Sequence, residues 1–180
     1  MSYYPLLKAP SASGWVTLCN FPPNNWEVAQ SQSQFINVTW ACGNFWLSKT
    51  LGILEYGGMR TITDTDIACF VPTETLALLS LTSAPLPAES AVLPKLNCAR
   101  SNVPAWRATL GLSTLNAKTS YQGELDAFPA QGSLLTFGPF FQFGEGCNNH
   151  LILLNIENSP VTRVGELEVY DADALDFKRK

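Results

Sequence analysis

Charged side chains are scarce in this sequence. Asp, Glu, Lys and Arg together make up 14% of its 180 residues, against about a quarter in an average soluble domain. A surface with so few charges must be covered by Ser, Thr, Asn, Gln, Gly and apolar groups instead. Because charged residues are depleted from the cores of protein interfaces, this composition favours self-association or a broad partner interface. It also fits a β-rich protein whose turns are rich in Ser and Thr.

Positive charge is missing where a nucleic-acid-binding protein needs it. The formal net charge is −4, and the only basic cluster is Lys178–Lys180 at the end of the sequence. Binding to phosphates depends on clustered Lys and Arg, so we expect no nucleic-acid partner. No apolar run reaches the roughly 20 residues that span a bilayer. The first residues also lack the positive segment and long apolar stretch of a signal peptide. We therefore expect a cytoplasmic protein with no membrane partner.

Motifs for metal, nucleotide and serine chemistry are absent as well. With His150 as the single histidine, multi-histidine metal sites are excluded. No GxGxxG, P-loop or GxSxG element occurs, and Asp64-Thr65-Asp66 lacks the glycine and distal glutamate of a calcium-binding loop. We therefore predict no cofactor and no metal site. Five cysteines without a CxxC pair are most simply buried small hydrophobes in a reducing compartment: Cys19, Cys42, Cys69, Cys98 and Cys147.

Alternation of apolar and polar residues is the dominant pattern. In the segment Phe35–Ala41, Ile36 and Val38 alternate with Asn37 and Thr39, which is typical of an antiparallel strand with one buried face and one exposed face. Similar segments predict strands at Trp15–Asn20, Phe35–Ala41, Phe45–Leu54, Arg60–Thr63, Ile67–Val71, Thr75–Leu81, Trp106–Leu112, Thr119–Leu125, Ser133–Phe137, His150–Ile156 and Arg163–Tyr170.

Turn signals rich in Gly, Pro and Asn separate these segments at roughly 8 to 15 residues, a spacing that suits a sandwich or a barrel. Helical periodicity is confined to Trp26–Ser33 and Asp171–Phe177. We predict an all-β fold, an antiparallel β-sandwich that is jelly-roll-like, in one domain over residues 1–180. A closed β-barrel is the alternative. The stretch 85–104, which holds four prolines, is predicted to connect the two halves.

A β-hairpin is predicted from Trp106–Leu112 and Thr119–Leu125. The symmetric register pairs Leu110 with Tyr121, Ala108 with Gly123 and Trp106 with Leu125, and it gathers apolar residues on one face. The opposite face then carries a polar stripe: Arg107, Gln122 and Glu124, with Asp126 just beyond. These side chains can bind the hydroxyls of a sugar. Glu124 and Asp126 are two positions apart on one strand, with Cα atoms about 6.6 Å apart, and can also act as acid and base. The same stripe also fits a solvated face with a surface ion pair.

Aromatic residues are the second source of candidate sites. Trp15, Trp40 and Trp106 lie in strand patterns and are predicted to be core residues. Trp26 follows a turn rich in Pro and Asn, so we expect it on a loop, where aromatic and amide groups bind glycans or form protein hot spots. Neighbouring strand residues face opposite sides. One of Phe45-Trp46 must therefore face outward or enter a second interface.

The four phenylalanines of Phe137–Phe143 surround Pro139, which favours an edge strand or bulge there. If one face of this segment is left uncovered, a second copy of the chain is a natural cover, and we expect a homo-oligomer.

Taken together, these features favour a non-enzymatic binding or assembly module that recognises a glycan or a protein partner. The candidate ligand-binding residues are Trp26, Arg107, Gln122, Glu124 and Asp126. One alternative is an enzyme acting on sugars or other polar metabolites, with Glu124 and Asp126 as acid and base. Another is a structural subunit of a larger particle.

Overall fold

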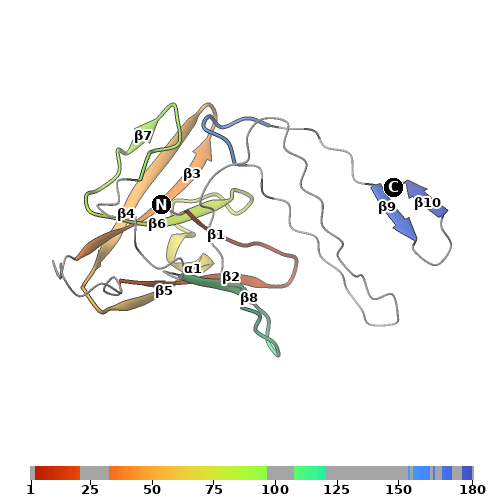
Figure 1. Cartoon of the computed structure of the whole chain (residues 1–180), viewed down its shortest axis with the longest axis horizontal. Helices are drawn as coiled ribbons and strands as arrows, with labels where there is room; N and C mark the ends of the chain where they lie inside the picture. Colours follow the sequence, from red (N-terminus) through yellow and green to blue (C-terminus); the bar gives the residue numbers. More distant parts are fainter. Residues whose placement is uncertain are drawn as a thin grey trace, which may run out of the picture.

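The computed structural model describes residues 3–20, 33–96, 108–120, 154, 156–162 and 164, together with the backbone of two strands at 168–171 and 176–179. Its elements are β1 (Tyr4–Leu6), β2 (Ser13–Cys19), β3 (Gln34–Cys42), β4 (Phe45–Leu54), β5 (Met59–Thr63), α1 (Asp64–Ile67), β6 (Ala77–Thr82), β7 (Glu89–Ser90), β8 (Ala108–Ser113), β9 (Glu168–Asp171) and β10 (Asp176–Arg179) (Figure 1). The predicted all-β class is confirmed. No helix among the described residues is both long and apolar enough to cross a membrane.

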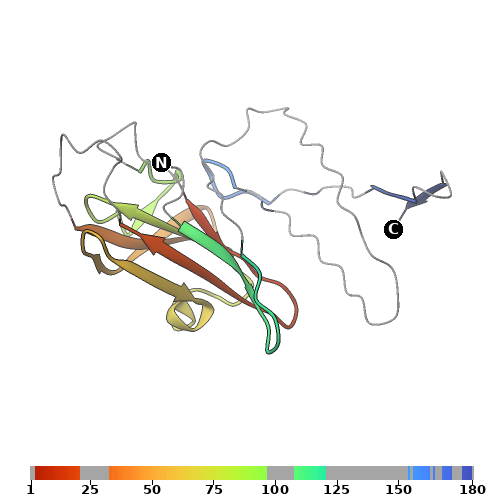
Figure 2. The ribbon, with the colours of Figure 1, turned by 60° about the horizontal axis from the view of Figure 1, so that its bottom comes forward.

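Most strands belong to two antiparallel sheets. The larger has five strands in the order β1-β6-β3-β4-β7, and the smaller has three in the order β5-β2-β8. Strands β9 and β10 pair with each other as a separate antiparallel hairpin. Figure 1 shows the three-stranded sheet beneath the five-stranded one, and Figure 2 turns its strands toward the viewer. In the described part of the chain neither sheet closes into a barrel, so the structure does not support the predicted alternative.

A hydrophobic core lies where the two sheets face each other. Val16 and Leu18 of β2 and Leu110 of β8 pack in one cluster with Ile36 and Val38 of β3. Alternate residues of each strand enter this cluster, as the period of two in a pleated strand requires. Burying one such side chain contributes roughly 1.5–3 kcal/mol. Burial of the apolar side chains in this cluster therefore stabilises the packing of the two sheets.

The second face of the five-stranded sheet is also buried. Asn37 and Thr39 of β3 point to this face, and both are 0% exposed. The prediction that β3 has one solvent-exposed face is therefore wrong. The physical reason is that the chain between β6 and β7 returns over this face, where Leu86 packs with Leu78 and Trp46 in a second buried cluster. The polar side chains of β3 on this face therefore take part in buried hydrogen bonds and are not exposed to solvent.

The described part of the predicted 85–104 connection has a regular structure of its own. Strand β7 pairs with β4, and the backbone N–H of Ser48 donates to the carbonyl oxygen of Ala88 at 2.9 Å. Leu93 and Leu96 then enter the second buried cluster. This segment therefore covers the sheet as well as connecting two parts of the chain.

Several predicted elements differ from the observed ones. The segment Ile67–Val71 was predicted as a strand. It begins instead at the last residue of α1 and continues into a turn. The reason is that Thr63 caps the helix and favours a helical turn after β5. The helical turn predicted at Asp171–Phe177 is contradicted by strands β9 and β10. Strand β1 was not predicted at all; its Pro5 and its three-residue length give little alternation to recognise.

Candidate functional site

The five residues predicted to bind a ligand, Trp26, Arg107, Gln122, Glu124 and Asp126, lie outside the described residues. Their proposed roles stay predictions. The start of their hairpin is described, and it has the predicted register: Ser113 bridges to Lys118, and the N–H of Thr119 donates to the carbonyl oxygen of Leu112 at 2.8 Å. Ala108 and Leu110 enter the core cluster, as predicted for the apolar face.

The described tryptophans are all buried. Trp40 belongs to the core cluster, and Trp15 lies beneath the ammonium of Lys118, 4.1 Å from its ring centre. Phe45 is 44% exposed whereas its neighbour Trp46 is 4% exposed and enters the second cluster. The prediction that these two neighbours face opposite sides is confirmed. Neither Trp15 nor Trp40 offers an open ring to a ligand.

The first hollow of interest lies beside Trp46, and we call it the Trp46 hollow. It has a volume of about 480 Å³ and lies between the β3–β4 turn and residues 157–162. The turn is the two-residue loop Gly43-Asn44 between Cys42 and Phe45. Gly43 has a φ of 59° while Asn44 has a negative φ, the pattern of a type II′ turn, which requires glycine at its first central position.

A carbonyl group of the facing segment fixes the wall of the Trp46 hollow. The carbonyl oxygen of Asn158 accepts the indole N–H of Trp46 at 2.9 Å and the backbone N–H of Leu93 at 2.5 Å. Ile156, two residues earlier, is buried in the second cluster. The segment that follows Asn158 is therefore held against the sheet by both hydrogen bonds and apolar packing.

The lining of the Trp46 hollow combines several polar groups with a rigid ring. The amide of Asn44, the carboxylate of Glu157 and the hydroxyls of Ser159 and Thr162 line it together with Trp46. Because Trp46 is nearly covered, its ring forms a wall of the hollow and not an open stacking platform. The volume falls within the roughly 300–1,000 Å³ typical of ligand sites. Chemically, the amide and the hydroxyls of the lining suit a ligand rich in hydroxyl groups.

Sequence reasoning missed the polar residues of this hollow. Asn158-Ser159-Pro160 shows only a turn signal in the sequence, and Asn44 shows only a short loop. The two segments are more than a hundred positions apart, and no local pattern indicates that they meet. Trp46 itself was singled out, on the alternation argument alone.

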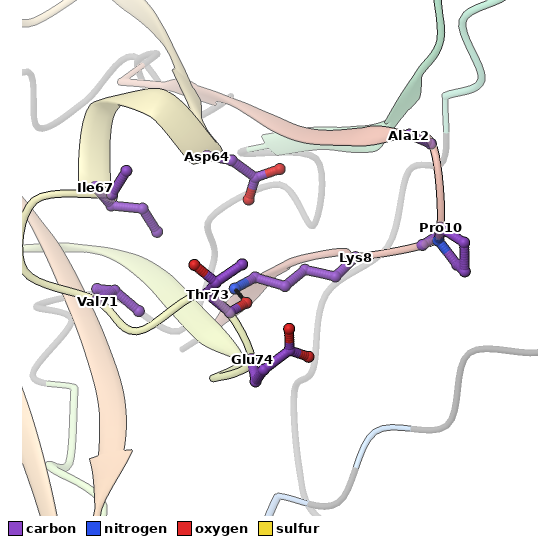
Figure 3. A pocket seen from close by; sticks show the side chains of 10 residues that line it. Lys8, Pro10, Ala12, Asp64, Ile67, Val71, Thr73 and Glu74 are labelled. Carbon is purple, nitrogen blue, oxygen red and sulfur yellow. Dashed lines mark hydrogen bonds between the residues drawn. The ribbon is translucent and has the colours of Figure 1, made fainter.

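A second hollow, which we call the Lys8 hollow, lies between the chain that follows β1, helix α1 and the loop before β6. Its volume is about 520 Å³, and Figure 3 shows the side chains that surround it. The ammonium of Lys8 donates to the carbonyl oxygens of Thr73 and Pro72. Asp64 and Glu74 also line this hollow.

The carboxylates of Asp64 and Asp66, whose spacing gives only a weak calcium-ligand signal, make hydrogen bonds within the chain. Asp66 closes a capping box: its Oδ2 accepts the backbone N–H and the hydroxyl of Thr63, each at 2.8 Å. These two hydrogen bonds lower the pKa of Asp66, and Arg60 adds a smaller electrostatic effect in the same direction. Asp64 Oδ2 accepts the backbone N–H of Gly14 at 2.8 Å. The described residues contain no cluster of His, Cys, Asp and Glu that fits a metal ion.

The cysteines differ from the prediction. Cys42 and Cys69 are exposed free thiols, and Cys19 is half-buried, so the interpretation of all five as buried hydrophobes is wrong for this part of the chain. Cys42 lies at the end of β3 where the strand leaves the sheet, and Cys69 follows α1. Burial raises the pKa of the Cys19 thiol. Burial also raises the pKa of the Tyr3 phenol, whose hydroxyl donates to the carbonyl oxygen of Pro94 at 2.5 Å.

The chain matches no protein-family model, and no curated protein or solved structure is significantly similar to it. Function is therefore inferred from the side chains themselves.

Proposed function

We propose that the chain is a non-enzymatic binding module that recognises a glycan in the Trp46 hollow. The observation that carries this proposal is the meeting of the β3–β4 turn with residues 157–162 around a hollow of about 480 Å³. Asn44, Ser159 and Thr162 supply an amide and two hydroxyls, which can both donate and accept hydrogen bonds. A glycan hydroxyl has the same double capacity. The polar stripe of Gln122, Glu124 and Asp126 with Arg107, and Trp26, remain proposed parts of the binding surface.

The finer fold is proposed on the same basis. We infer that the two sheets form a single-domain, jelly-roll-like β-sandwich, because one buried cluster takes side chains from both. A sandwich places its loops at the two ends of the sheets, and the β3–β4 turn at the Trp46 hollow is such a loop. A domain of this kind is expected to unfold in one cooperative transition.

A protein partner or a homo-oligomer is the second candidate. Phe45, which is 44% exposed, and Val161, which is 43% exposed, lie at or beside the Trp46 hollow. Exposed apolar groups beside polar ones are typical of protein interfaces. The alternative of an enzyme with Glu124 and Asp126 as acid and base stays a prediction, because both residues lie outside the part of the chain that the structure describes.

A glycan-array screen of the full chain tests the proposal. We expect the wild type to bind a glycan and the Ser159→Ala, Thr162→Val double variant to bind the same glycan at least about fivefold more weakly. Two lost hydrogen bonds at about 0.5–1.5 kcal/mol each account for a change of that size. The matched control is Ser83→Ala, which removes an exposed hydroxyl outside the hollow.

Two outcomes contradict this function. If the wild type binds no glycan and light scattering shows a stable oligomer, the partner is a second copy of the chain. If the bound glycan is chemically changed in a reaction that depends on Glu124 or Asp126, the protein is an enzyme.

A further inference from the structure

The hydrophobic core is incompletely covered along β4. Residues directly opposite each other in paired strands lie on the same face of a sheet. Leu47 is opposite Trp40 and Lys49 is opposite Val38, and both Trp40 and Val38 belong to the core cluster. This face of β4 is therefore the one that faces the three-stranded sheet. The smaller sheet has three strands against five in the larger one, and it leaves Leu47 half-buried and Lys49 exposed.

Apolar side chains surround Lys49 on this face. Leu47 and Leu51 are half-buried and pack against the core cluster, and so does Phe70 from the turn after α1. The ammonium of Lys49 lies 4.1 Å from the centre of the Phe70 ring. The Phe70 ring is itself 5.6 Å from the ring of Trp40, so it is held against the core. We call the surface formed by Leu47, Lys49, Leu51 and Phe70 the β4 flank.

The charges at the β4 flank are positive, although the whole chain has a net charge of −4. Besides Lys49, the guanidinium of Arg60 lies beside Leu51 and donates to its carbonyl oxygen at 3.3 Å. In the described part of the chain no carboxylate forms an ion pair with either cation. Apolar groups around cations are complementary to apolar groups around carboxylates.

A second copy of the chain does not supply that complement. In a two-fold dimer the same surface patch of both copies meets itself. Such a dimer would bring Lys49 and Arg60 of one copy against the same cations of the other, and like charges placed against each other lower the affinity. The β4 flank therefore favours a different protein that carries carboxylates.

We propose that the β4 flank docks an extended segment of a partner protein in which a carboxylate lies between two apolar side chains. The flank presents apolar, cationic and apolar residues at every second position, Leu47, Lys49 and Leu51, and such positions on one strand face are about 6.6 Å apart. Partner residues at the same spacing pack on the two leucines and pair with Lys49. Contact with the Phe70 ring holds the ammonium in place before the partner binds.

This docking does not depend on the proposed glycan binding. Trp46 is buried in the second cluster, on the opposite face of β4, and the lining of the Trp46 hollow includes no residue of the β4 flank.

The test is an NMR titration of the ¹⁵N-labelled full chain with the peptide acetyl-Leu-Thr-Glu-Thr-Leu-amide, following the backbone amides of Lys49 and Phe70. A peptide of this size is expected to bind with a Kd on the order of 1 mM. Replacing both leucines of the peptide by serine, or its glutamate by lysine, is expected to weaken binding at least about fivefold. Equal binding of either altered peptide, or no shift at Lys49 and Phe70, overturns the proposal.

A charge exchange locates the contact. Lys49→Glu is expected to bind the glutamate peptide at least about fivefold more weakly than the wild type does, and the lysine peptide more tightly. Lys95→Glu, the matched change at an exposed lysine outside the β4 flank, is expected to leave both affinities unchanged. Lys49→Gln, with a smaller loss, decides the matter if the reversed charge disturbs the fold. Unchanged affinities in both Lys49 variants, or an equal loss in Lys95→Glu, overturn the proposal.

Discussion

Replacing Asn37 by aspartate places a carboxyl group in the buried polar row of the five-stranded sheet. Asn37 is 0% exposed. Its amide nitrogen donates to Thr82 Oγ1 at 2.7 Å and to the carbonyl oxygen of Phe35 at 3.3 Å, and its Oδ1 accepts the hydroxyl of Thr50 at 2.8 Å. The hydroxyl of Thr82 itself donates to the carbonyl oxygen of Ala84 at 2.5 Å. Both partners of the amide nitrogen therefore act as acceptors.

The ionised carboxylate of the Asn37→Asp variant cannot donate to these two acceptors. Losing the donor costs about 1–3 kcal/mol. Burial also raises the pKa of the new carboxyl group above its usual value of about 3.9, and each unit of that rise adds about 1.4 kcal/mol to the cost. The folded-state pKa is thus above the unfolded one, so the added cost is absent below about pH 4. It appears as the pH rises through the folded-state pKa. We expect a loss of at least about 3 kcal/mol at pH 7 and a smaller loss at pH 4.

Urea unfolding of the wild type and Asn37→Asp at pH 4 and pH 7 measures this difference. Asn116→Asp, which makes the same chemical change at an exposed loop position, is the matched control and is expected to change stability by less than about 0.5 kcal/mol. Equal losses for the two variants at pH 7, or a pH-independent loss for Asn37→Asp, would refute the account of the buried polar row.

Two further predictions concern local geometry. Gly111→Ala drives a Cβ into the backbone oxygen of Thr119, and we expect it to cost about 2–4 kcal/mol of stability. The control Gly43→Ala meets no atom but has a positive φ, so we expect it to cost about 1–2 kcal/mol. Similar losses of thermal stability for both variants would contradict the close approach at Gly111. Asp66→Asn keeps an acceptor for Thr63 but removes the negative charge that strengthens both hydrogen bonds, and it is expected to cost below about 1 kcal/mol at pH 7. The pKa of Asp66 is lower in the folded state than in the unfolded state. The contribution of Asp66 to stability is therefore present above its unfolded-state pKa and is lost as the pH falls through its folded-state pKa. A difference in stability between variant and wild type that is the same at pH 2 and pH 7 would contradict this.

Alternation predicted the strands because burial on at least one face imposes a period of two. The bounds of β4, Phe45–Leu54, agree with the prediction, and so does the Leu112–Thr119 register of the hairpin. Alternation cannot tell whether a polar face meets water or another part of the chain, and Asn37 was misinterpreted for that reason. At Ile67 the helix cap formed by Thr63 overrides the β-branched and apolar composition that predicted a strand.

The candidate site was only partly predictable. Trp46 was identified because it follows Phe45 in a strand, which is a local signal. The rest of the Trp46 hollow depends on a hydrogen bond from Trp46 to Asn158, 112 positions later in the sequence. Contacts of that range leave no periodic trace in one sequence. The Lys8 hollow is formed by similarly distant segments, and of its lining residues only Asp64 was noted in the sequence.

The most direct test of the proposed binding module is an NMR titration of the labelled chain with a glycan found in the array screen. It follows the indole N–H resonances of Trp46 and Trp15. Trp46 lines the proposed site and Trp15 lies under Lys118 in the other sheet. We predict that the Trp46 resonance and the amide of Asn44 shift with one shared Kd while the Trp15 resonance stays in place. Saturable glycan binding that leaves Trp46 and Asn44 unshifted would contradict the Trp46 hollow as the glycan site.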